Sequence, residues 1–253
     1  MAFRVAPATL AGGGYGGFND PGPLTHALGV NLIAYWNGGN SALTPEMVDL
    51  VDYWRRWHAA KIVISSLLTV VLALLATASW NRFLIAETRR SAVGHAVTAT
   101  VVSVLALCGV AVLVANVQST TAPLSALLGL LPVDPSGGEL GQALDQIREG
   151  LGDPASPYAD RPALAVMVSS YTRYLWAFVL VASVVAVGIA AAGVYAWKVF
   201  FRNGTADVRR RYTALGLGST AIIVAVATLV LVAASARSAL EPAGALLDFI
   251  NGG

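Results

Sequence analysis

Two histidines are the side chains of this sequence best suited to hold a metal ion or to support electron transfer. His58 directly precedes a long apolar segment, and His26 lies in the N-terminal segment on the same side of it. Asp49 and Asp52 lie within three helical turns of His58, and imidazole with carboxylate suits copper or zinc. The spacing matches no compact motif, so the two histidines are weak metal candidates. The alternative is that His58 is an ordinary side chain at the membrane edge.

Other chemistry has no signature in the sequence. A nucleophile elbow, an HExxH helix, a CxxC pair and paired catalytic carboxylates are all missing from it. The single cysteine, Cys108, lies inside an apolar segment and is expected to pack there as a thiol. We therefore predict no catalytic residue and no cofactor other than bound lipid. Enzymatic activity stays open, and a noncatalytic chain, including a noncatalytic subunit of an enzyme complex, is favoured over an enzyme.

The composition is that of a membrane protein. Apolar residues make up 56% of the chain and charged residues 12%, about half the charged fraction of a soluble domain. Four apolar segments, at about 61–85, 94–116, 174–200 and 213–236, are long enough to cross a bilayer. The prediction is an all-α integral membrane protein with four transmembrane helices. A net charge of +2 gives no reason to expect a nucleic-acid partner.

The same membrane hairpin occurs twice, in residues 44–131 and 165–250. Each copy has an aromatic and basic start, a span, a basic turn, a second span and an amphipathic, proline-led end. Because each copy has two spans, its two ends lie on the same side of the membrane. The two hairpins are therefore expected to be parallel. They would be related by a pseudo-twofold axis along the membrane normal, unlike inverted transporter repeats. The matched pairs are Trp80 with Trp197, Arg90 with Arg211, and Pro123 with Pro242.

The flanking segments complete the predicted organisation. Residues 1–43 form a Gly/Pro-rich segment with a short interfacial helix, and residues 132–164 form an acidic loop with an amphipathic helix near 138–150. Thr44 and Pro45 predict a helix start, with a capping hydroxyl followed by proline at the first turn.

Basic residues predict the orientation. The two short turns, 81–92 and 198–212, carry eight basic and two acidic residues, which places them in the cytoplasm. Both termini and the acidic loop are then extracytoplasmic, although Arg55, Arg56 and Lys61 at the outer edge keep the reverse orientation open. Abundant Ala, Val, Gly and Arg suggest the plasma membrane of a GC-rich bacterium. The topology residues are Arg89, Arg90, Arg209, Arg210 and Arg211.

Aromatic and small residues give the remaining expectations. Five tryptophans are predicted to anchor the spans at the two interfaces: Trp54, Trp57 and Trp176 outside, and Trp80 and Trp197 inside. A stripe of small residues predicts close helix packing: Ala182, Ala186 and Ala190.

Together these features predict a noncatalytic accessory or assembly subunit of a larger bacterial membrane complex. Its partners would be membrane lipids and other integral membrane subunits, or further copies of the chain. Two alternatives stay open. One is a transporter or channel-like protein for an apolar or lipidic molecule, and the other is a metal or electron-transfer subunit using His58 and His26.

Overall fold

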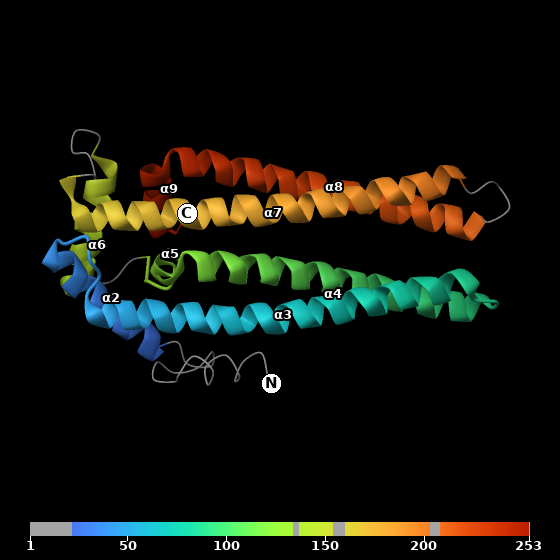
Figure 1. Cartoon of the computed structure of the whole chain (residues 1–253), viewed down its shortest axis with the longest axis horizontal. Coiled ribbons are helices and arrows are strands. Elements are labelled where there is room, and N and C mark those ends of the chain that lie inside the picture. The colour runs from blue at the N-terminus through green and yellow to red at the C-terminus, as the bar shows by residue number, and fades with distance from the viewer. Residues whose placement is uncertain (1–21, 134–136, 154–159, 203–207, 253) are drawn as a thin grey trace. The chain divides into compact units, whose positions relative to one another are not determined.

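A computed structural model describes residues 22–133, 137–153, 160–202 and 208–252. Helices make up 90% of the described residues, which contain no strand. The helices shown in Figure 1 are listed here in chain order: α2 (Gly22–Gly38), α3 (Pro45–Ile85), α4 (Arg89–Thr121), α5 (Pro123–Leu128), α6 (Gly138–Gly152), α7 (Pro162–Arg202), α8 (Val208–Leu240) and α9 (Pro242–Ile250).

Four of these helices, α3, α4, α7 and α8, are long and apolar enough to cross a membrane. Their most apolar windows have mean hydropathies of 2.3 to 2.6. The prediction of four spanning helices is confirmed at this level, and the chain has the make-up of a multi-pass membrane protein. Residues 1–21 of the predicted Gly/Pro-rich segment 1–43 lie outside the described residues.

The helix bounds repeat along the chain. Helices α3 and α7 both have 41 residues at an offset of 117, and α4 and α8 both have 33 residues at an offset of 119. The offset changes because five residues separate α7 from α8, whereas three separate α3 from α4. This register aligns Arg90 with Arg209 rather than with Arg211, which corrects the pairing predicted from sequence.

Local sequence explains where the helices begin. Pro45, Pro123, Pro162 and Pro242 each stand at the first helical position, where the missing N–H costs nothing. The predicted cap at Thr44 is present, since its Oγ1 accepts a hydrogen bond of 3.3 Å from Met47 N. The predicted helix near 138–150 corresponds to α6, and α5 and α9 are the two proline-led segments that follow α4 and α8.

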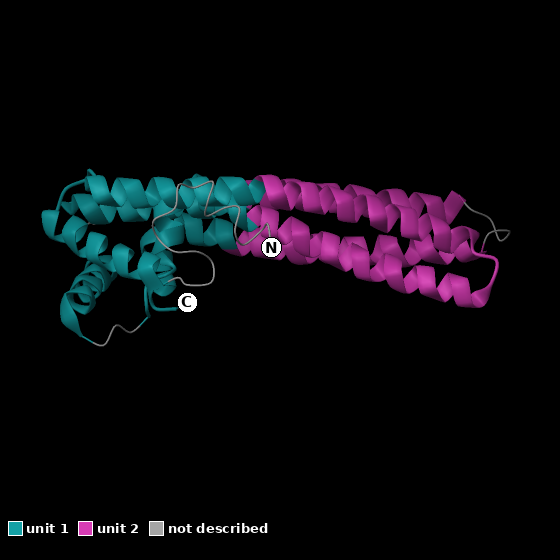
Figure 2. Ribbon diagram, turned by 90° about the horizontal axis from the view of Figure 1, so that it is seen from below, with its two compact units in different colours: residues 1–62, 115–178, 235–253 teal, residues 63–114, 179–234 magenta. Residues whose placement is uncertain are grey.

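The chain divides into two compact units, and each unit takes segments from both repeats (Figure 2). Unit 1 comprises residues 1–62, 115–178 and 235–253, and unit 2 comprises residues 63–114 and 179–234. The long helices α3, α4, α7 and α8 each contribute to both units.

Unit 1 contains the packed hydrophobic core. Its fully buried side chains come from every described helix of the unit except the ends of α4 and α8. Burial of such side chains removes apolar area from water at roughly 25 cal/mol per Å², so unit 1 has the driving force of a water-soluble domain. The largest members are Tyr35, Leu28, Leu32, Met47, Leu50, Tyr53, Leu127, Leu144, Ile147, Leu164, Met167 and Leu246.

Polar contacts tie the segments of unit 1 together. Arg148 on α6 donates to Asn251 Oδ1 beyond α9 at 3.0 Å and to Val133 O at 2.7 Å. Its Nη1 also pairs with Asp145 Oδ1 at 2.9 Å. Arg148 therefore fixes the end of the chain against the segment that follows α5.

Unit 2 is built in the opposite way. Only 6% to 28% of the most apolar window of each long helix is buried, and many large aliphatic side chains face outward. Exposed aliphatic surface of this extent is stable in lipid and not in water. Unit 2 is therefore the part of the chain suited to the bilayer.

Small residues bring the helices of unit 2 together. Ala182 and Ala186 are buried, and Ala190 is half-buried. Close contact between α7 and α8 occurs at Gly193 and Gly218, where a Cβ on either glycine would lie 3.2–3.3 Å from the other's carbonyl oxygen. Such close approach is the usual basis of helix association in membranes.

Candidate functional site

The two histidines lie in different surroundings. His26 is exposed on α2, whereas His58 is buried on α3 with Nδ1 3.0 Å from Trp54 O. No hydrogen bond or ring contact joins the two residues in the described part of the chain. The described residues also contain no group of three or more side chains that could hold a metal ion.

His58 belongs to a buried aromatic and basic cluster on α3, formed by Trp54, Trp57, His58 and Lys61. Each of the four side chains is at most 8% exposed. Trp54 contacts His58 with ring centroids 4.4 Å apart, and Lys61 Nζ lies 4.6 Å from the centre of the Trp57 ring. The indole nitrogens of Trp54 and Trp57 find no hydrogen-bond partner among the described residues.

The second copy of the repeat lacks this cluster. At the offset of 117, its four positions are occupied by Tyr171, Tyr174, Leu175 and Phe178. Tyr171 and Tyr174 pack instead against Phe249 of α9, at 5.2 and 6.4 Å between ring centroids. The basic residues of this cluster are therefore specific to the first copy and are not part of the repeated pattern. Among the predicted anchors, Trp54 and Trp57 are buried, Trp176 is exposed, and Trp80 and Trp197 are half-buried.

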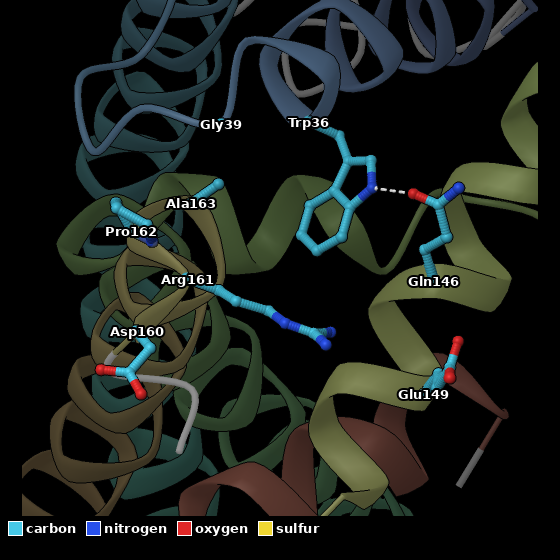
Figure 3. Close-up of a pocket in the computed structure, with 8 residues that line it drawn as sticks. All are labelled: Trp36, Gly39, Gln146, Glu149, Asp160, Arg161, Pro162 and Ala163. Atoms are coloured by element: carbon cyan, nitrogen blue, oxygen red, sulfur yellow. Dashed lines mark hydrogen bonds between the residues drawn. The ribbon is translucent and has the colours of Figure 1, made fainter. Parts of the chain in front are cut away.

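Unit 1 also carries an open pocket of about 480 Å³ lined by three segments that are far apart in sequence (Figure 3). Trp36 comes from the end of α2, Gln146 and Glu149 come from α6, and Arg161 directly precedes α7. The pocket therefore forms only when α2, α6 and α7 pack in unit 1. Its other lining residues are Gly39, Asp160, Pro162 and Ala163.

The walls of this pocket are held in place by specific contacts. Trp36 Nε1 donates to Gln146 Oε1 at 2.7 Å, which fixes the indole ring. The Tyr35 hydroxyl donates to Ala163 O at 3.5 Å, and burial raises the pKa of that hydroxyl. A Cβ on Gly150 would lie 2.5 Å from Arg161 Nη1, so the Arg161 side chain packs closely over α6 at this glycine.

Arg161 is the one cationic side chain among the residues that line the pocket, and Glu149 and Asp160 are the two acidic ones. Figure 3 shows its guanidinium in the space between the Trp36 ring and the Glu149 side chain, while Asp160 points the other way. Its guanidinium makes no ion pair or hydrogen bond with another described residue. A planar guanidinium beside an indole face is suited to bind a carboxylate in two-point fashion. The pocket can therefore bind an anionic group but has no evident nucleophile.

The predicted topology arginines lie in two settings. Arg89, Arg90 and Arg210 are exposed, as expected for residues at a membrane surface. Arg209 and Arg211 are half-buried against aromatic rings, with their Cζ atoms 5.5 Å from the Phe83 ring and 4.7 Å from the Phe200 ring. Phe83 and Phe200 occupy equivalent positions of the repeat, at the offset of 117.

A second cavity, of about 560 Å³, lies in unit 2 between the end of α3 and the first halves of α4 and α8. Its walls are mainly apolar, and Arg209 is the one basic residue among those that line it. We call this cavity the α3–α4–α8 groove. The remaining lining residues are Trp80, Phe83, Ala96, Thr100, Ser103, Val104, Leu107, Val208, Tyr212, Thr213, Gly216, Leu217 and Thr220.

Sequence alone did not single out either cavity. Arg161, Trp36 and Glu149 are 12 to 125 residues apart and follow no motif. The one available signal was Arg161 itself, which with Arg148 is one of two basic residues in an acidic loop. Arg209 was predicted as a topology residue only. Comparisons with protein-family models, with curated proteins and with solved structures find no match to this chain.

Proposed function

We propose that the chain is a noncatalytic subunit of a membrane protein complex and that it uses unit 1 to engage a partner. The observation that supports this most directly is the Arg161 pocket, which offers an indole face and a guanidinium with no partner in the described chain. Tryptophan and arginine are the residue types that most often dominate the energetics of protein interfaces. A carboxylate of the partner, set against the Trp36 ring, is the complement that this pocket suits.

The proposal includes an arrangement in the membrane. The two repeats form parallel hairpins, the basic segments 81–92 and 198–212 face the cytoplasm, and unit 1 with both termini is extracytoplasmic, in a bacterial plasma membrane. Its support is the excess of basic residues at the two turns. The apolar outer surface of unit 2 then serves as contact area for lipid and for neighbouring helices.

Residue substitution in the pocket tests the docking role. A photo-crosslinking amino acid at Glu149, on the exposed rim, should join a defined partner when the chain is expressed in its native membrane. Arg161→Glu reverses the charge and should lower the yield of that adduct about tenfold or more, since interface arginines at such sites contribute roughly 2 kcal/mol. Arg56→Glu is the matched control, because Arg56 is exposed in unit 1 and lies outside the pocket. Equal adduct yields for the two variants would refute docking at this pocket.

A second candidate function is the binding or carriage of a lipidic molecule. The observation that favours it is the α3–α4–α8 groove, an apolar cavity in the unit suited to the bilayer. Extraction in mild detergent separates the two candidates. A chain that elutes as a monomer with lipid and with no other protein favours lipid binding, and a chain that elutes with a stoichiometric partner favours the subunit role.

A further inference from the structure

The α3–α4–α8 groove combines an apolar cavity with one fixed cation. We propose that it binds one acyl chain of an anionic phospholipid, whose phosphate pairs with Arg209. This inference concerns the isolated chain in a bilayer and does not depend on a protein partner.

Arg209 is held in a single position before any ligand binds. Its Nη1 donates to Phe83 O at 3.1 Å and to Ala86 O at 2.6 Å, which satisfies two carbonyls at the end of α3. The guanidinium also lies 5.5 Å from the centre of the Phe83 ring. These contacts fix the group from the α3 side, so little side-chain entropy remains to be lost on binding.

The same contacts leave binding capacity on the guanidinium. Arginine has five N–H donors, and Nη1 uses two for the α3 carbonyls. The remaining donors make no hydrogen bond with another described residue. A fork of N–H donors on a fixed cation is the geometry that recognises phosphate.

The walls of the groove are more apolar than their residue types suggest. Ser103 Oγ donates to Ala99 O at 2.7 Å and accepts from Trp80 Nε1 at 3.2 Å. Thr213 Oγ1 donates to Arg209 O at 2.8 Å. Because these hydroxyls are already bonded within the chain, the surface they present suits hydrocarbon rather than a polar solute.

Charge at this end of unit 2 favours an anionic lipid. Segments 81–92 and 198–212 carry eight basic and two acidic residues, and they include Phe83 and Arg209, which line the groove. Basic residues beside a span attract anionic headgroups, at about 1 kcal/mol for each. A free phosphate ion would meet the same cation but would leave the apolar cavity unfilled, so we assign the occupant as a lipid.

The test uses the purified, delipidated full chain in mild detergent. Phosphatidylglycerol and phosphatidylcholine with identical acyl chains are titrated separately, and bound lipid is counted by native mass spectrometry. We expect one phosphatidylglycerol to bind about tenfold more tightly than phosphatidylcholine, the scale of one charge-assisted contact. Inorganic phosphate should not displace it at millimolar concentration. Equal affinity for the two lipids, or displacement by phosphate, would overturn the inference.

Two pairs of variants locate the site. Arg209→Gln should abolish the preference for phosphatidylglycerol, and Arg90→Gln should retain it, because Arg90 holds the equivalent position in the other repeat and does not line the groove. Gly216→Leu should lower affinity for both lipids by filling the groove, since a Cβ there meets no atom within 4 Å. Gly188→Leu is its control, being equally open on α7 but outside the groove.

The Gly216 pair keeps the inference testable if Arg209→Gln fails to fold, because Gly216→Leu leaves the contacts of Arg209 with α3 intact. Circular dichroism and the elution volume of each variant check its folding. Equal lipid affinity in Gly216→Leu and Gly188→Leu would show that the groove is not the site. Loss of the partner adduct in the Arg161 experiment, by contrast, has no bearing on lipid binding.

Discussion

At the scale of single residues, the Arg161 pocket depends on polar side chains that are far apart in the sequence and are brought together by packing. Tyr35 and Arg161 lie 126 residues apart in sequence, yet both act at one pocket. Tyr35 supports the wall through its hydrogen bond to Ala163 O, and Arg161 supplies the charge. The pocket therefore depends on Tyr35, which is buried and supports the wall, and on Arg161, whose guanidinium lies in the open pocket.

The raised pKa of Tyr35 predicts a pH dependence of stability. Burial disfavours the phenolate, so the folded state holds the Tyr35 proton more tightly than the unfolded state. The resulting stability is present below the ordinary pKa of 10.0 and is lost as pH rises through the higher folded pKa. Unfolding free energies measured between pH 8 and pH 11 (about one unit beyond the ordinary value) should fall more steeply in the wild type than in Tyr35→Phe. Identical pH profiles would contradict this assignment.

At the scale of helices, the two copies of the repeat have helices of equal length. They carry different residues at the positions where α3 contacts α4 in the first copy. Thr69 on α3 and Gly109 on α4 form one close contact, and the equivalent positions of the second copy hold Ala186 and Thr228. The larger side chain is thus on the first helix in one copy and on the second helix in the other.

This exchange predicts a non-additive pair of substitutions. A Cβ on Gly109 would lie 2.6 Å from Thr69 Oγ1, so Gly109→Ala should destabilise the chain by about 1 kcal/mol. Adding Thr69→Ala should recover most of that loss, as coupled neighbours do. Gly94→Ala on the same helix, where a Cβ meets no atom within 4 Å, should be neutral or stabilising. Thermal unfolding in mild detergent measures all three, and additive effects would argue against the contact.

At the scale of the whole molecule, the two units satisfy different solvents. Unit 1 buries a large apolar core, as a domain in water does, and Lys61 is a charged side chain buried with it. Unit 2 exposes aliphatic side chains and packs through small residues, because hydrocarbon supplies no hydrophobic force between helices. Each long helix has one part in unit 1 and one part in unit 2, and its pattern of buried residues changes from one part to the other.

The proposed orientation predicts which positions react from outside the cell. In a Cys108→Ser background, Asp160→Cys places a thiol in unit 1, and Thr88→Cys places one in the turn between α3 and α4. A membrane-impermeant maleimide should label the Asp160→Cys variant in intact cells and the Thr88→Cys variant only after permeabilisation. The reverse pattern would invert the topology.

The sequence by itself determined the four long helices, their repeat, the proline-led starts and the small residues at which α7 packs. These properties follow from composition and from spacing of a few residues along one helix, so neighbours in the chain suffice to specify them. It did not determine that Trp54 and Trp57 are buried, since their position beside a span predicts the membrane interface equally well.

Tertiary structure alone decided the Arg161 pocket and the α3–α4–α8 groove. Each is made by segments from three places in the chain, and no local pattern records which segments will meet. Arg209 shows the difference most clearly: its charge could be seen in the sequence, but its two bonds to the α3 carbonyls could not. A cavity is the space left when helices pack, and that space depends on the contacts of all its walls at once.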